Sequence, residues 1–333
     1  MRIIKLIAIF IFFWNLSSAQ HYYFQEISVS EGLANEKIYK VYEDKNHFIW
    51  LGNEYGVSFY NGIQTINYTS ADGLGIGGVK SIFQDRFGNM IFGHYDGAIS
   101  YLKNDKFTVV DSLPITGHVY QIIESNDYLW LATVNSGAYR IKVNRKKDGW
   151  DFSHAVNFLG KDGLSDRVFK ITELKNGNLL FITDAGLKKY DQQSQKFVNY
   201  KKNRIPGYFQ FTSILEASDG KLYLGTHTGG LYIFNPQNDK ISFLDEKKGL
   251  SNNFITDLVE DKQGRIWIGT FGGGLNMLKG KEISIFDNTN GFPDKKIQSL
   301  LVNFEGMLLV GTNDFGLQLF KGFQFLKFMI YKS

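Results

Sequence analysis

An internal repeat of about 43 residues constrains the fold of this chain more than any other feature. Each copy has a polar turn, an apolar strand that ends in a small residue, and then a second strand. The residues at the small position lie 39 to 50 residues apart and are Gly52, Gly93, Ala132, Ile182, Gly225, Gly269 and Gly311. Self-similarity at this period is typical of stacked repeat architectures. Ile182 marks the fourth copy as the most divergent.

The best preserved copy, residues 249–288, contains four short apolar segments separated by tight turns. We expect strands at 254–260, 265–270, 275–278 and 282–286, which together form one antiparallel sheet. A sheet that is apolar on both faces is stabilised by stacking on its neighbours around an axis. The prediction is an all-β fold: a single seven-bladed β-propeller of four-stranded antiparallel blades over residues 20–333. The longer third interval contains 144–149, which we interpret as an outer hairpin.

Composition agrees with this interpretation. The 333 residues include 35 Gly and only 4 Pro, so glycine turns dominate, and the 16% aromatic content indicates a packed chain. With 37 Lys and Arg against 33 Asp and Glu, and no block of five or six like charges, we expect no nucleic-acid partner.

Residues 1–19 read as a secretory signal peptide, with Arg2 and Lys5 before an apolar run at 6–14 and a small-residue end at 17–19. An uncleaved membrane anchor is the alternative, but the run is shorter than the ~20 residues of a spanning helix. We therefore expect an exported protein, periplasmic or at the cell surface, with no membrane span in the mature chain. Without Cys it has neither disulfides nor a lipoprotein anchor.

Large aromatic residues recur in the second strand of a copy, as Trp50, Trp130, Tyr223 and Trp267. They could be stacking platforms for sugar rings. Their recurrence at equivalent places instead favours packing between blades.

Four short motifs resemble the two-component regulator propeller repeat: the Gly-Leu-x-Asn/Asp start, the Ile-x-x-Ile/Leu-x-Glu-Asp strand end, the Gly-x-Ile-Trp-Ile-Gly-Thr strand and the Gly-Gly-Leu turn. The resemblance covers about residues 22–328. It implies the periplasmic sensor half of a hybrid two-component system that binds glycan fragments, with a membrane histidine kinase or a second propeller as partner. The chain has one propeller and no kinase or receiver sequence, so we expect no kinase activity from it. It is then a truncated sensor or a stand-alone protein.

The chain has one more outer-strand candidate than a ring of seven needs. We expect 23–28 to close the last blade by pairing with 316–320, since closure removes two exposed sheet edges. A surplus strand at about 322–330 then follows. The alternative is that the C-terminal strand closes the ring.

The loops that enter each innermost strand, and the turns between second and third strands, share one face of a propeller. They vary while the strands repeat, as a binding surface on a repeated scaffold would. The ligand-binding candidates on this face are Asn35, Glu54, Tyr55, His94, Tyr95, Arg167, Asp184, Tyr208, Phe209, His227, Asn253, Phe271, Lys295 and Asn313. Aromatic, amide and charged side chains together suit an oligosaccharide or another small polyhydroxylated ligand.

Catalytic signals are weak. The histidines lack metal-ligand spacing, and His94 with His227 makes an incomplete metal site, so we expect no metal, no cofactor and no catalytic residue. Two alternatives stay open beside a non-enzymatic sensor. One is a lyase or glycoside hydrolase that uses these histidines or the rim carboxylates Glu54, Asp96, Asp166, Asp184 and Asp314. The other is a protein-interaction scaffold at the cell surface.

Overall fold

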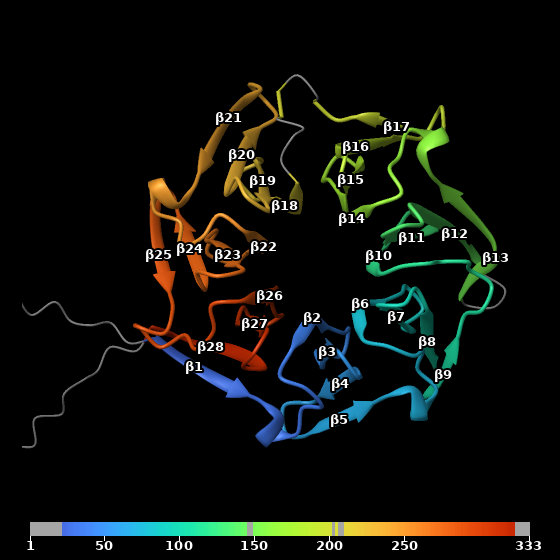
Figure 1. Ribbon diagram of the computed structural model, residues 1–333, viewed down its shortest axis with the longest axis horizontal. Coiled ribbons are helices and arrows are strands. Elements are labelled where there is room, and N and C mark those ends of the chain that lie inside the picture. The colour runs from blue at the N-terminus through green and yellow to red at the C-terminus, as the bar shows by residue number, and fades with distance from the viewer. Residues whose placement is uncertain (1–21, 145–148, 202–203, 206–209, 324–333) are drawn as a thin grey trace, which may run out of the picture.

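The computed structural model describes residues 22–144, 149–201, 204–205 and 210–323. Its strands form seven four-stranded antiparallel sheets around a central axis, the seven-bladed propeller that the repeat predicts (Figure 1). In the described part of the chain, no helix is both long enough and apolar enough to span a membrane.

The first four blades run in chain order, each from its innermost to its outermost strand. Blade 1 contains β2 (Ile38–Glu43), β3 (Ile49–Asn53), β4 (Gly56–Tyr60) and β5 (Thr65–Tyr68). Blade 2 contains β6 (Val79–Gln84), β7 (Met90–His94), β8 (Ile99–Lys103) and β9 (Lys106–Val109). Blade 3 contains β10 (Val119–Ser125), β11 (Tyr128–Thr133), β12 (Ala138–Asn144) and β13 (Gly149–Phe158). Blade 4 contains β14 (Val168–Glu173), β15 (Leu179–Thr183), β16 (Gly186–Asp191) and β17 (Lys196–Asn199).

The last three blades complete the ring. Blade 5 contains β18 (Phe211–Glu216), β19 (Leu222–Thr226), β20 (Leu231–Asn235) and β21 (Lys240–Leu244). Blade 6 contains β22 (Ile255–Glu260), β23 (Ile266–Thr270), β24 (Leu275–Lys279) and β25 (Glu282–Phe286), each within one residue of the prediction. Blade 7 contains β26 (Ile297–Val302), β27 (Leu308–Thr312), β28 (Leu317–Phe323) and, outermost, β1 (Tyr22–Ile27). Asn144 pairs with Gly149, so the long third interval is an outer hairpin as predicted.

Short 3-10 helices lead from one blade to the next and explain the Gly-Leu start of the repeat. They are η1 (Val29–Glu31), η2 (Ser70–Asp72), η3 (Gly160–Asp162) and η4 (Glu246–Lys248). Each ends at a glycine in the left-handed region, such as Gly249 with φ 102°. A residue with a Cβ is strained there, so glycine is required. The leucine that follows, Leu250, is buried between blades 5 and 6.

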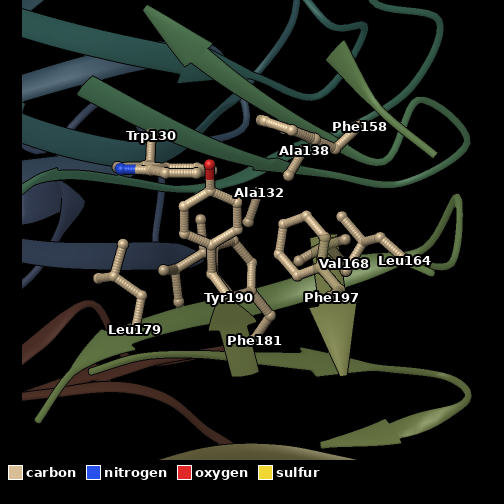
Figure 2. Close-up of a cluster of buried hydrophobic side chains, with 11 residues drawn as sticks. Trp130, Ala132, Ala138, Phe158, Leu164, Val168, Leu179, Phe181, Tyr190 and Phe197 are labelled. Atoms are coloured by element: carbon tan, nitrogen blue, oxygen red, sulfur yellow. The ribbon is translucent and has the colours of Figure 1, made fainter. Parts of the chain in front are cut away.

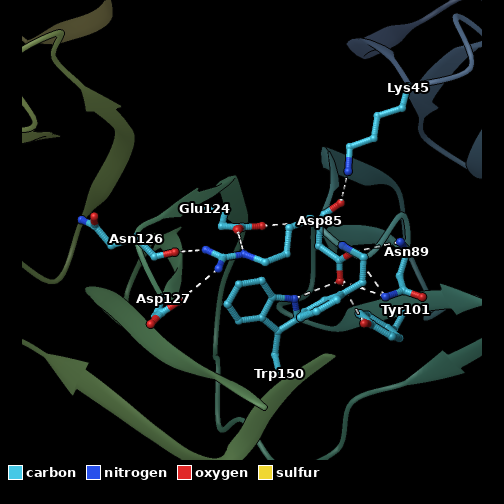
Figure 3. A network of polar contacts seen from close by, with 10 residues as sticks. Lys45, Asp85, Asn89, Tyr101, Glu124, Asn126, Asp127 and Trp150 are labelled. Atoms are coloured by element: carbon cyan, nitrogen blue, oxygen red, sulfur yellow. Dashed lines mark hydrogen bonds and ion pairs between the residues drawn. The ribbon is translucent and has the colours of Figure 1, made fainter. Parts of the chain in front are cut away.

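The turn between first and second strands explains the Asp and Trp of the repeat. Asp261 Oδ1 accepts hydrogen bonds from two backbone N–H groups of its own turn, and Oδ2 accepts one from Trp267 Nε1 at 2.7 Å. Asp44 accepts likewise from Trp50 Nε1 at 2.8 Å. In blade 2 the carboxylate of Asp85 instead accepts from Trp150 of blade 3 (Figure 3). These bonds satisfy the polar indole edge where the ring is buried.

A second polar contact joins neighbouring blades on the same side of the ring. The last residue or last but one of an innermost strand accepts a backbone N–H from the turn of the preceding blade at 2.6 to 3.0 Å. The acceptors are Glu43, Gln84, Glu124, Glu216 and Glu260. In Figure 3 an arginine of blade 2 adds ion pairs to Glu124 and Asp127. The Glu of the strand-end motif thus connects blades.

The apolar core is divided into seven clusters, one at each boundary between blades. Between blades 3 and 4, Trp130 stacks on Phe158 at 5.7 Å between centroids and meets Phe181 edge-on at 5.4 Å (Figure 2). Trp130 and Trp267 are at most 2% exposed. The prediction that these tryptophans pack between blades is therefore confirmed, and they are not platforms for a ligand.

The N-terminal strand closes the ring, as predicted. β1 pairs antiparallel with β28, with Phe24 opposite Phe320 and Ile27 opposite Leu317. One detail differs: β28 continues to Phe323, because Tyr22 extends the pairing to that residue. Residues 322–323 therefore belong to the closing blade rather than to a surplus strand, and the rest of the predicted surplus strand lies outside the described residues.

Candidate functional site

A cavity of about 530 Å³ lies on the propeller axis. The innermost strands of all seven blades, with the residues just before β18 and β22, contribute to its wall. Its volume lies within the range of small-molecule sites in proteins. Because every blade supplies part of the wall, the cavity exists only when the ring is closed.

A β-bulge at the same place in each innermost strand determines which side chains line the cavity. The pairing register shifts between the first and third residues of β2, β6, β10, β14, β18, β22 and β26. A bulge sets two residues opposite one, so the second and third residues both border the channel. The second residues are Tyr39, Lys80, Tyr120, Phe169, Thr212, Thr256 and Gln298, and all line the cavity. The third residues that line it are Lys40, Ser81, Gln121, Lys170, Asp257 and Ser299.

Aromatic rings form a continuous arc along blades 1 to 4. The ring centroids of Tyr39 and Tyr95 are 6.5 Å apart. Tyr95 contacts His118 at 3.6 Å, and His118 meets Tyr120 edge-on at 5.8 Å. Tyr120 meets Phe169 edge-on at 5.8 Å. A second aromatic group, from blades 5 and 6, places Phe254 4.1 Å from His227 and 5.5 Å from Phe271. The cavity thus has aromatic surfaces on two sides.

Four charged side chains also line the cavity: Lys40, Lys80, Lys170 and Asp257. Lys170 Nζ lies 2.8 Å from Asp257 Oδ1, and this lysine together with Lys40 holds the pKa of the buried carboxyl below its ordinary value. Burial lowers the pKa of Lys40, while the charge of Asp257 opposes that shift. Burial, helped by the nearby charge of Lys37, lowers the pKa of Lys80 to about 8.

The loops that enter the innermost strands hydrogen-bond to the turns that follow the second strands. Tyr95 N donates to Gly78 O, and His227 N donates to Gln210 O. Of the predicted ligand-binding residues, His227 lines the cavity, while Tyr95 and Phe271 contact rings that do. Five other predicted residues are exposed on the surrounding turns and loops without lining the cavity: Glu54, Tyr55, Arg167, Asp184 and Lys295.

Other predicted residues hold the loops in shape. Asn35 Oδ1 accepts from Lys37 N at 2.7 Å. Asn253 exchanges hydrogen bonds with Glu246 at 2.9 Å, and Asn313 Oδ1 accepts from a cavity-lining glutamine at 3.0 Å. Tyr208 and Phe209 lie outside the described residues.

His94 lies in blade 2 rather than on the open face. It is fully buried, with Nε2 2.7 Å from Ser100 Oγ and Nδ1 3.2 Å from Gly77 O. Burial lowers its pKa. His94 and His227 therefore do not form one site across the channel.

The described residues do not assemble a carboxylate pair in the cavity. Asp257 is the one acidic side chain among the described lining residues, and its two oxygens bind Lys170 Nζ and Leu300 N, the latter at 3.0 Å. Of the rim carboxylates, Asp184 accepts from Ser165, and Asp314 pairs with Lys296 at 3.1 Å. In the described ranges, no three His, Asp or Glu side chains are grouped as metal ligands.

The sequence-based prediction placed the binding residues in variable loops. It therefore missed most of the cavity wall, which is formed by the innermost strands. A signal does exist in the sequence. The first residue of each innermost strand is a buried Val, Ile or Phe, and the two residues after it change from copy to copy in chemistry and size. Aligning the copies on that apolar residue selects Tyr39, Lys80, Tyr120 and Phe169.

The fold and the cavity together define a seven-bladed β-propeller with a ligand-sized central site. Residues 249–272 match the family model of the two component regulator propeller, so the resemblance inferred from the repeat is confirmed in blade 6. No curated protein matches the chain in sequence.

Solved structures show the same fold at low identity. The extracellular domain of the hybrid two component system BT3049 from B. thetaiotaomicron is 18% identical with a TM-score of 0.75, covering 90% of this chain and 42% of that one. A virginiamycin B lyase from Staphylococcus aureus is 15% identical with a TM-score of 0.69, covering 90% and 99%. PorZ, a surface component of the type-IX secretion system of Porphyromonas gingivalis, is 15% identical with a TM-score of 0.66, covering 87% and 47%. The chain spans less than half the length of the extracellular domain that it matches.

Proposed function

We propose that this protein is an exported sensor module without catalytic activity, and that its central cavity binds an oligosaccharide. The observation that carries the proposal is the cavity itself, walled by aromatic rings on two sides and by amides and hydroxyls between them. Aromatic faces pack on the apolar faces of sugar rings, while polar groups bind their hydroxyls.

The similarity to extracellular domains of two component systems supports the sensing role. In that role a ligand-induced change at the propeller reaches a membrane histidine kinase or a second propeller, which we propose as partners. Both oxygens of Asp257 accept hydrogen bonds, and no second carboxylate is among the described lining residues. This argues against the hydrolase alternative, since glycoside hydrolysis ordinarily needs two carboxyl groups that flank the glycosidic bond.

The test is calorimetry against a panel of oligosaccharides, with product release followed in the same samples. We expect heat of binding without turnover. Tyr120→Ala should weaken binding at least ten-fold, because Tyr120 belongs to the aromatic arc. Tyr55→Ala is the matched control, since Tyr55 is 61% exposed on a neighbouring turn outside the cavity.

Other outcomes reject the proposal in distinct ways. Turnover that His227→Ala abolishes would favour a lyase. If no oligosaccharide of the panel gives heat or product, oligosaccharide binding is rejected. The remaining hypothesis is then a protein-interaction scaffold, the role suggested by the likeness to PorZ.

A further inference from the structure

The cavity lining is richer in positive charge than the chain as a whole. Over the whole sequence 37 basic residues nearly balance 33 acidic ones. Among the described lining residues there are three lysines, Lys40, Lys80 and Lys170, and one carboxylate, Asp257. The bulges of four different innermost strands bring these side chains together.

One lysine and the carboxylate neutralise each other. Lys170 Nζ is 2.8 Å from Asp257 Oδ1. The other oxygen of Asp257 accepts the backbone N–H of Leu300, which fixes the carboxylate against blade 7. Asp257 therefore has little capacity left for a second cation, and two lysines remain in excess.

Lys80 faces rings instead of an acidic partner. Its Nζ lies 3.7 Å from the ring centroid of Tyr39, 5.3 Å from that of Tyr95 and 5.9 Å from that of Tyr120. No ion pair of Lys80 within 4 Å occurs among the described residues, and Glu54 acts on it only at longer range. Cation–π contacts stabilise an ammonium group, but they do not neutralise its charge.

Lys40 is the second lysine in excess. It follows Tyr39 in β2 and is therefore next to the aromatic arc. It feels Asp257 electrostatically without an ion pair in the described structure, and Lys170 repels it. Withdrawing an ammonium group from water without a counter-ion is costly.

We propose that the cavity is built for an anionic saccharide, one that carries a carboxylate or a sulfate group. The anion pairs with Lys80, Lys40 of the adjacent blade adds positive charge to the same cavity, and the sugar rings pack along the arc of Tyr39, Tyr120 and Phe169. A neutral ligand would leave both lysines without a counter-ion. A cationic ligand would find the tyrosine rings already in contact with the ammonium group of Lys80. This inference rests on the proposed function, whose ligand class it narrows.

The first test compares trigalacturonate with its methyl ester, which has the same backbone without charge. We expect the acid to bind at least ten-fold more tightly than the ester. Lys80→Gln should remove that difference, whereas Lys240→Gln, an equal loss of charge on the exposed outer strand β21, should preserve it. Equal binding of acid and ester to the wild-type protein overturns the inference while leaving oligosaccharide binding intact.

The pH dependence of this affinity gives a second readout. Lys80 faces three tyrosines from β2, β10 and the turn after β7, with Lys37 and Glu54 as its nearest charges. Binding of the acid should weaken as pH rises through about 8, where Lys80 loses its proton, and binding of the ester should not change. A flat profile for the acid contradicts the role of Lys80.

A measurement that does not depend on the choice of saccharide separates this inference from the proposed function. Lysines are reductively methylated with ¹³C, which keeps their charge, and the Lys80 resonance is assigned from Lys80→Gln. We expect it to shift with sodium glucuronate or sodium sulfate and not with glucose. If the panel of saccharides is silent but this shift occurs, the anion site stands and oligosaccharide binding fails. If neither anion shifts the resonance, the inference is wrong.

Discussion

Lys80 shows how a single buried charge can lower the stability of the folded chain. Its ammonium group lies among tyrosine rings at the channel wall, where burial lowers its pKa from 10.5 to about 8. The folded chain therefore releases this proton at a lower pH than the unfolded chain does. Between about pH 8 and 10.5 the unfolded state binds more protons, so this lysine makes the free energy of unfolding rise with pH across that window.

This residue gives a prediction at neutral pH. We expect Lys80→Met to raise the free energy of unfolding at pH 7 by on the order of 1–2 kcal/mol, because one pKa unit is worth about 1.4 kcal/mol and lost cation–π contacts offset part of the gain. Urea unfolding at pH 7 and pH 10 measures it, and the advantage of the variant should shrink at pH 10. Lys240→Met is the control on an exposed strand. A variant that is less stable than wild type at pH 7 would contradict the account.

At the scale of the strand, the small residue of the repeat lets neighbouring blades approach. Gly225 lies in β19, and a Cβ built there would be 2.6 Å from Ile255 Cγ2 of blade 6 and 2.3 Å from Ser213 Oγ. Gly269 has the same relation to Ile297 at 2.7 Å. Glycine recurs at this position of the repeat because it leaves room for the next blade, and not because it forms a turn. In blade 4, Ile182 instead packs in a cluster with Phe211.

We expect Gly225→Ala to cost about 1–3 kcal/mol of stability, the usual range for forcing an extra carbon into a packed core. Gly160→Ala is the matched control, since nothing lies within 4 Å of a Cβ at that position and its φ is not positive. Thermal or urea unfolding of both variants decides. Equal stability of the two would refute the spacing role.

At the scale of the whole molecule, the ring depends on a strand from the other end of the chain. In β1, Phe24 packs on Phe292 at 4.9 Å and on Phe320 at 5.1 Å between ring centroids, joining the core between blades 6 and 7. Tyr23, next to it, points outward and is 51% exposed. Blade 7 thus obtains its outermost strand from the N-terminal end of the described chain and has four strands like the other blades.

Phe24 and Tyr23 allow a test of how β1 stabilises the closed ring. Phe24→Ala should lower stability by about 2–4 kcal/mol, somewhat less than for a fully buried Phe, because Phe24 is partly exposed. Tyr23→Ala should change it by less than about 0.5 kcal/mol, as for most surface substitutions. Unfolding curves for the two variants measure the contrast. Similar losses would mean that β1 contributes through its backbone alone.

The fold could be predicted because its determinants are local and recur. The Gly at 249 needs a left-handed φ, Trp267 needs the acceptor at Asp261, and each copy repeats the same turns. Ring closure could be predicted too, since counting strands leaves one place for 23–28. Such features depend on a few neighbouring residues, so their spacing in the chain is enough to recognise them.

The site was recovered only in part, because its members are far apart in sequence. His227 was singled out and does line the cavity, while His94 was singled out and is enclosed by Ser100 and Gly77. Lys80 was overlooked because it lies in a strand and not in a variable loop; it is found only when the copies are aligned on the buried first residue of each innermost strand.

The repeat, the number of blades and the strand expected to close the ring can all be read from the amino-acid sequence. Which side chains share the cavity depends on how the blades are arranged in space. Lys40, Lys80 and Asp257 lie 40 or more residues apart in the sequence. The bulge that turns two successive side chains toward the axis is a property of strand pairing. These side chains come close to one another only when the seven blades form a closed ring. No single repeat contains the cavity.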